Sequence, residues 1–116
     1  MQRAFPLFVT SWLLVACTPA GVPSASGAEA RRLVAAGATL VDVRTEGEFT
    51  RGHADGALNV PLGDLRQRLA EIPKDRPVVT YCMAGARSGR AAALLAAEGY
   101  EVHDLGSLSK WNDAAP

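Results

Sequence analysis

The segment from Val78 to Gly99 constrains the fold most, because an apolar run, a cysteine-containing loop and an alanine-rich stretch follow one another directly. Val78 to Tyr81 are β-branched or aromatic, which predicts a short strand buried on both faces. Cys82 follows at the carboxyl end of this strand. Ser88 is the expected N-cap of a helix that ends at Gly99. The order strand, loop, helix is the repeating unit of α/β proteins.

The same alternation continues through the rest of the chain. Ser26 and Glu29 resemble a capping box at the start of a first helix. We expect helices over 28–36, 46–51 and 62–72, and further strands over 39–43, 57–60 and 100–105. Such alternation implies an α/β fold with a small, mostly parallel central sheet and helices on both faces. A length of 116 residues with 48% apolar content supports one domain with one modest core.

The loop after Cys82 favours a reactive thiolate. Residues 83–87 are too few to do more than curl, so their N–H groups should surround the sulfur and form an anion-binding nest. Arg87 and Arg90 add positive charge. We therefore expect the pKa of Cys82 to lie below the reference of about 8.5 for a free thiol. The alternative is that Cys82 is an inert residue at the end of a core strand.

Two blocks of the sequence resemble the rhodanese-domain sulfurtransferases. Residues 82–90, CMAGARSGR, resemble the active-site loop of that family, which has a Cys, two variable residues, Gly, one variable residue and Arg-Ser. Residues 41–61 resemble a second family block, with Asp42, Arg44, Glu48, Phe49, Gly52, His53, Gly56, Ala57, Asn59 and Pro61 in order. The resemblance implies a rhodanese-like α/β fold. Ala54 and Asp55 replace the usual Ile and Pro, so we expect a looser turn, and the usual first strand should be shortened.

The resemblance implies that Cys82 is the nucleophile of a sulfur transfer. Cys82 would take the outer sulfur of a small anionic donor, thiosulfate or a persulfide, and pass it to a thiol or cyanide. No cofactor is implied. The residues expected to bind the donor are Met83, Ala84, Gly85, Ala86, Arg87, Ser88 and Arg44. An ion pair with Glu48 is the alternative role for Arg44.

Two other functions stay open. One is a non-catalytic rhodanese-type module that binds a partner or senses oxidants through Cys82. The other is an arsenate reductase or phosphatase-like enzyme, but related enzymes of that kind have five residues between Cys and Arg, whereas four lie between Cys82 and Arg87. The small apolar residues of the loop favour a larger persulfide, a polysulfide or a protein acceptor.

Charge and composition argue against several partners. Twelve basic residues balance twelve acidic ones and form no basic stripe, so we expect no nucleic-acid partner. With only two histidines and no clustered carboxylates, no metal site is expected. His53 is assigned to packing and turn formation, His103 to the surface, Asp42 to a structural acceptor role, and Trp111 to the core.

Residues 1–16 are typical of an export signal, with a basic start and an apolar run of about thirteen residues before Cys17. Leu14 to Cys17 resembles a bacterial lipobox, which implies that the Cys17 sulfur carries lipid. Residues 17–27 would then be a flexible tether and 28–116 the rhodanese-like domain. Cys82 would be the only free thiol, so no disulfide forms within the chain.

The lipidated chain would be exported and anchored to a bacterial membrane, facing the periplasm or the cell exterior. Thr18 is not the aspartate linked with inner-membrane retention, which favours the outer membrane where two membranes exist. The alternative is an ordinary secretory signal that is cut after Ala20 or near Ala28.

Overall fold

The structure is a computed structural model that describes residues 21–116. The expected signal, 1–16, and the expected lipidation site, Cys17, lie outside these residues. The helices are α1 (Gly27–Ala35), α2 (Glu46–Arg51), α3 (Ala86–Ala97) and α4 (Leu108–Asp113); the strands are β1 (Thr39–Asp42), β2 (Leu58–Asn59), β3 (Val78–Cys82) and β4 (Val102–Ser107); two short 3-10 turns are η1 (Leu62–Asp64) and η2 (Leu69–Glu71). Within 21–116, no helix has the length and apolar content needed to cross a bilayer.

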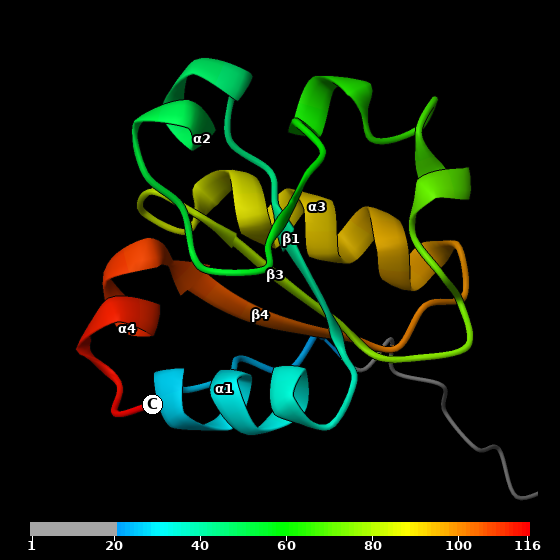
Figure 1. The fold of residues 1–116 in the computed structure, drawn as a ribbon. Coiled ribbons are helices and arrows are strands. Elements are labelled where there is room, and N and C mark those ends of the chain that lie inside the picture. The colour runs from blue at the N-terminus through cyan, green and yellow to red at the C-terminus, as the bar shows by residue number, and fades with distance from the viewer. Residues whose placement is uncertain (1–20) are drawn as a thin grey trace, which may run out of the picture.

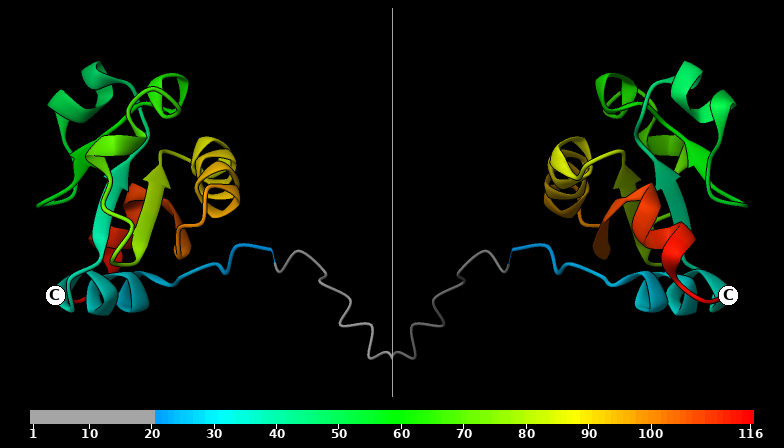
Figure 2. Two further views of the ribbon diagram at one scale, coloured as in Figure 1. Left: turned by 90° about the vertical axis from the view of Figure 1, so that its right-hand side faces the viewer. Right: turned by 90° about the vertical axis from the view of Figure 1, so that its left-hand side faces the viewer.

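The four strands form one parallel sheet in the order β2-β1-β3-β4 (Figure 1). Helices α1 and α4 lie on one face of the sheet, and α3 lies on the other (Figure 2). The α/β fold with a small parallel sheet and helices on both faces is therefore confirmed. All strands point the same way, so their carboxyl ends meet at one edge, where ligands of such sheets bind.

The central strand β3 is buried along its whole length, as its apolar sequence predicts. Its residues alternate between the two faces because side chains of a strand point to opposite sides in turn. Val78 and Cys82 pack on the α3 side with Leu95, whereas Val79 and Tyr81 pack on the α1 and α4 side. Cys82 is therefore held rigidly by the core of the domain.

The sheet edge beside β4 carries the remnant of a first strand. Ser24 makes an isolated parallel bridge to Asp104, and the Ala25 N–H donates to the Asp104 carbonyl at 2.9 Å. Ala25 is only 2% exposed. The first strand is thus shortened, as expected, and the folded part begins before Ala28, inside the segment expected to be a tether.

Residues 62–72 do not form the single amphipathic helix that their apolar spacing predicts. They form η1 and η2, separated by a turn over 65–68 whose last residue, Arg68, has φ −112° and ψ 15°. The Tyr100 hydroxyl donates to the Leu69 and Ile72 carbonyls at 3.0 and 2.8 Å, and Arg68 donates to the Asn59 carbonyl. The predicted single helix is therefore wrong, although its apolar residues Leu65 and Ile72 are buried. Side chains from outside the turns bind the carbonyls at their ends and hold the segment against the rest of the domain.

Candidate active site

The Cys82 sulfur lies where β3 ends and the loop to α3 begins. The Gly85 N–H donates to this sulfur at 3.0 Å. Gly85 has φ +103°, a left-handed conformation that favours glycine and turns the chain back toward the cysteine. The N-cap of α3 is Gly85, three residues before the expected N-cap at Ser88, and Ser88 is instead buried in the first turn of the helix.

The environment of Cys82 lowers the pKa of its thiol. Burial raises the pKa. Hydrogen bonds from the Ser88 hydroxyl and from the backbone N–H groups of Ser88, Gly85 and Ala84 lower it by a larger amount. The net shift is downward from an ordinary value of 9.0. The loop thus has the nest character expected from its length, and it favours the ionised, nucleophilic form of Cys82.

The Gly106 carbonyl of β4 closes the site from the other side. The Cys82 thiol donates to this carbonyl at 3.4 Å, and the Ser88 hydroxyl lies 3.2 Å from it. A hydroxyl has one proton and rotates freely, so Ser88 can turn from the carbonyl toward the sulfur when Cys82 ionises. Ser88 therefore contacts the reactive sulfur through its side chain and does not cap α3, and its expected role in binding the donor stays a prediction.

Arg87 forms an ion pair with a residue of another helix. Its two terminal nitrogens donate to the carboxylate oxygens of Glu48 in α2 at 2.7 and 3.0 Å. The Arg87 hydrogen bond is the main cause that lowers the pKa of Glu48 to about 2, against an ordinary 4.5. The positive charge of Arg87, expected to bind the donor, is thus compensated by a carboxylate.

Arg44 is 2% exposed and pairs with Asp42, not with Glu48 as the alternative interpretation held. Its Nη2 atom lies 2.6 Å from Asp42 Oδ2 and donates to the Gly52 carbonyl at 2.7 Å. Asp42 also accepts from the Tyr81 hydroxyl at 2.7 Å. Asp42 is therefore the structural acceptor that was expected. Arg44 is occupied by these bonds, and donor binding by this residue stays a prediction.

A cavity of about 260 Å³ lies beside the Cys82 loop. Met83, which is 52% exposed, and Leu108 give it an apolar side, and Arg51 gives it a cation. Within residues 21–116, Arg51 makes no ion pair. The remaining residues that line the cavity are Arg44, Glu48 and Gly52.

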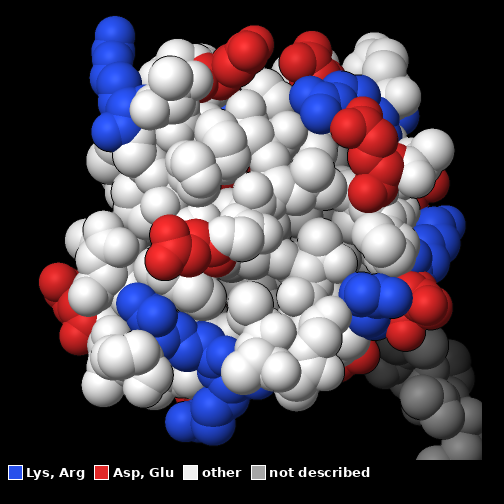
Figure 3. All heavy atoms as spheres, in the orientation of Figure 1, with Lys and Arg blue, Asp and Glu red and all other residues white. Residues whose placement is uncertain are grey.

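On the face of the molecule shown in Figure 3, acidic and basic side chains are scattered, and no large area of one sign covers it.

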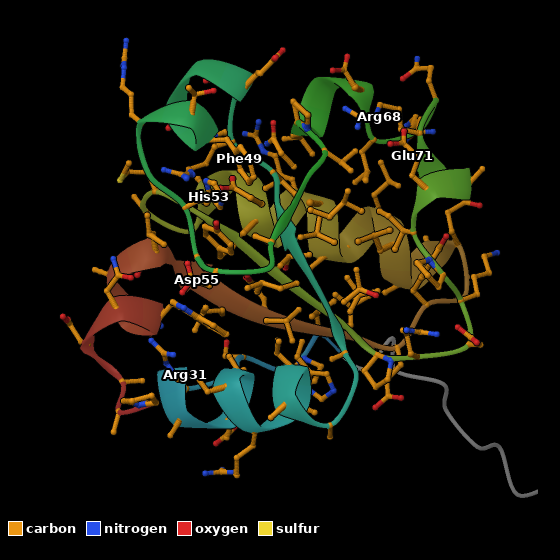
Figure 4. The ribbon with its side chains drawn as sticks, in the orientation of Figure 1. Arg31, Phe49, His53, Asp55, Arg68 and Glu71 are labelled. Atoms are coloured by element: carbon orange, nitrogen blue, oxygen red, sulfur yellow. The ribbon has the colours of Figure 1, made fainter. Side chains whose placement is uncertain are left out.

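His53 belongs to packing, as expected. Its ring stacks on Phe49 with centroids 3.7 Å apart, and its Nδ1 atom lies 2.9 Å from the Phe49 carbonyl (Figure 4). The following Ala54 is buried and its N–H donates to the Tyr81 hydroxyl at 3.1 Å. The turn is therefore anchored to the sheet, in contrast to the looser turn expected from Ala54 and Asp55. Among residues 21–116, no group of three His, Cys, Asp or Glu side chains is placed to hold a metal ion.

Comparisons with known proteins identify the family of this chain. The chain is 49% identical over 76 residues to the uncharacterized protein YqhL of Bacillus subtilis, covering 64% of this chain and 60% of YqhL. It is 36% identical to the thiosulfate sulfurtransferase GlpE of Shewanella oneidensis, covering 65% of this chain and 76% of GlpE. The solved human single-domain sulfurtransferase TSTD1 superimposes with a TM-score of 0.68 at 29% identity, covering 83% of this chain and all of TSTD1. The rhodanese-like domain model matches residues 26–114, and the chain belongs to the rhodanese-like domain family.

Proposed function

We propose that this chain is a sulfurtransferase that carries sulfur on Cys82. The observation that carries the proposal is the placement of the Cys82 sulfur at the start of α3, 3.0 Å from the Gly85 N–H, with its pKa lowered. A thiolate is the form that attacks sulfur. Membership of the rhodanese-like family and the relative named a thiosulfate sulfurtransferase support the same reaction.

The reaction proceeds in two displacements. The Cys82 thiolate attacks the outer sulfur of thiosulfate, a new S–S bond forms, and the bond to the sulfonate sulfur breaks, which releases sulfite and leaves a Cys82 persulfide. The electron pair of the broken bond leaves with sulfite. A thiolate or cyanide then attacks the outer sulfur of the persulfide, and the Cys82 thiolate is the leaving group. A low-molecular-weight persulfide can replace thiosulfate as donor in the first step.

The loop stabilises both anionic states of Cys82. The Gly85 N–H and the Ser88 hydroxyl lie at the sulfur and can donate to the thiolate or to the negative persulfide. Because these donors are fixed by β3 and α3, they need little rearrangement when the charge moves from one sulfur to the next.

Intact-mass measurement after exposure to thiosulfate tests the proposal. We expect the purified protein to gain the mass of one sulfur atom, to release one equivalent of sulfite, and to lose the added mass when cyanide is supplied. Cys82→Ser is the matched control and should gain no mass. A protein that becomes oxidised without releasing sulfite would be a redox-sensing module. Hydrolysis of a small aryl phosphate in place of sulfur transfer would indicate phosphatase-like chemistry.

We also propose that the chain is exported and anchored by lipid on Cys17, facing the periplasm or cell exterior. The proposal rests on the basic start, the apolar run and the lipobox-like residues before Cys17. Labelling of cells with a radioactive fatty acid tests it: the wild-type protein should carry the label in the membrane fraction and Cys17→Ser should not. An unlabelled wild-type protein would support an ordinary secretory signal.

A further inference from the structure

Glu48 is the only acidic residue among those that line the cavity beside the Cys82 loop within the described chain. It comes from α2, whereas Arg87 comes from the first turn of α3, so the ion pair joins α2 to the helix that follows the Cys82 loop. We propose that Glu48 sets donor specificity: by neutralising Arg87, it disfavours doubly charged donors such as thiosulfate relative to singly charged sulfane-sulfur donors. This inference rests on the proposed sulfurtransferase function.

The ion pair is held in place from both sides. Glu48 also accepts from the Thr45 N–H and hydroxyl in a capping box at the start of α2. The end of α2 is fixed to the sheet, because the Gly52 carbonyl accepts from the buried Arg44. Two parallel N–H···O bonds at 2.7 and 3.0 Å fix the plane of the Arg87 guanidinium. Arg87 is thus directed at a protein carboxylate when no donor is bound.

The remaining groups of the cavity favour a donor with little charge. Arg44 is compensated by Asp42 at 2.6 Å, which leaves Arg51 as the cation without an ion pair within residues 21–116. Met83 and Leu108 offer an apolar surface next to it. One cation beside an apolar surface suits a donor that has one negative charge and an alkyl group.

The proposal predicts how much kcat/KM should rise for donors of different charge when the Glu48 charge is removed. Glu48 repels a donor in proportion to the donor's negative charge, so the gain should be larger for the donor with more charge. Coulomb's law in water-like surroundings gives the size of this effect. For a donor charge about 8 Å from the Glu48 carboxylate, removing the carboxylate raises kcat/KM about 2-fold for a singly charged donor and about 5-fold for a doubly charged one. The larger gain is the square of the smaller, within error.

Thiosulfate and methanethiosulfonate are a suitable pair of probes, because a methyl group replaces one charged oxygen and both transfer their outer sulfur. Attack by the Cys82 thiolate releases sulfite from the first and methanesulfinate from the second, and leaves the same Cys82 persulfide. The experiment measures kcat and KM for both donors in the full-length chain and in Glu48→Gln, with cyanide as acceptor. Glutamine at this position retains the capping box. Glu46→Gln, which removes the same charge from the same helix without touching Arg87, is the matched control.

We expect Glu48→Gln to raise kcat/KM for thiosulfate about 5-fold, chiefly through KM, and for methanethiosulfonate about 2-fold, with both gains falling as salt is added. Glu46→Gln should change the ratio between donors little, and Glu48→Asp should keep the wild-type ratio. Equal changes for both donors, or a loss of kcat with both, would mean that Glu48 only holds Arg87 in position, and would overturn the inference. Failure of the wild-type chain to form a persulfide with either donor would instead refute the proposed function, and the inference with it.

Discussion

Asp42→Asn is expected to destabilise the domain strongly, because it breaks an ion pair that is wholly buried. Asp42 is 0% exposed and Arg44 is 2% exposed. The carboxylate accepts from the Arg44 backbone N–H at 2.9 Å, from the guanidinium, and from the Tyr81 hydroxyl at 2.7 Å. Asparagine has the same shape but no charge, and its amide group brings N–H donors toward other donors. Arg44 would then be an uncompensated charge in the core.

The expected magnitude follows from the cost of leaving one member of such a pair alone. Breaking a buried ion pair by removing one partner destabilises a protein by about 3–5 kcal/mol. A domain of this size has a total unfolding free energy of about 5–15 kcal/mol. Since the unfolding free energy of a small domain falls by roughly 1–1.5 kcal/mol for each molar of urea, the midpoint of unfolding should fall by about 2–5 M.

Urea denaturation followed by circular dichroism measures this loss. Asp75→Asn is the control, because Asp75 pairs with Arg76 in solvent, with side chains 74% and 50% exposed, and should change the midpoint little. The double variant Asp42→Asn/Arg44→Met removes both charges and should recover more than half of the loss. The reasoning is refuted if Asp42→Asn costs less than about 1 kcal/mol, or if the double variant is no more stable than the single one.

Three further predictions concern the loop, the helix contact and the surface ion pair. Gly85→Ala should cost about 1 kcal/mol, because φ is +103° there, and should raise the pKa of Cys82, so alkylation by iodoacetamide at neutral pH slows. Gly27→Ala should lower the unfolding free energy by about 1–3 kcal/mol in urea melts, because a Cβ would lie 2.1 Å from the Lys110 carbonyl oxygen. The Glu48 carboxylate has its pKa lowered to about 2, so its contribution to stability should be complete above about pH 4.5 and lost as the pH falls through about 2; acid titration of unfolding in wild type and Glu48→Gln measures it.

Each of these predictions has a result that contradicts it. Unchanged alkylation of Cys82 in a folded Gly85→Ala protein would show that the loop N–H groups do not set the pKa. Gly47→Ala is the control for Gly27→Ala, because it lies in a helix with open space around its Cβ, and it should stabilise by about 0.5–1 kcal/mol. Equal destabilisation by the two alanines would point to backbone effects alone. If the unfolding free energy of wild type and of Glu48→Gln depended on pH in the same way, the Glu48–Arg87 ion pair would contribute nothing to stability.

The sequence predicts the strand β3, the reactive loop and the position of Cys82 because these depend on local chemistry. The β-branched run and the alanine-rich helix are read from neighbouring residues, although the N-cap of α3 is Gly85 and not the expected Ser88. The break within 62–72 is not local: the carbonyls of Leu69 and Ile72 are taken by Tyr100, which is more than 25 positions away. Apolar spacing alone fits a helix and two 3-10 turns equally well.

The partners of the two arginines were the least predictable part of the site, and the reason is physical. Glu48 is 39 positions from Arg87, and only the packing of α2 beside the start of α3 brings them together. Arg44 had two carboxylates within reach along the chain, and burial decides between them. Asp42 lies on a core strand, where a carboxylate without an opposite charge would destabilise the fold, so Asp42 pairs with Arg44.

The two ion pairs have different roles: the Asp42–Arg44 pair stabilises the fold, and the Glu48–Arg87 pair affects donor binding. The Asp42–Arg44 pair is buried and holds the end of α2 through the Gly52 carbonyl, so it determines where Glu48 stands. The Glu48–Arg87 pair is partly exposed, with side chains 25% and 35% accessible, so a donor entering the cavity can compete for Arg87. A substitution at Asp42 should therefore alter donor preference and destabilise the domain strongly, whereas one at Glu48 should alter donor preference and cost less stability, because its ion pair is partly exposed.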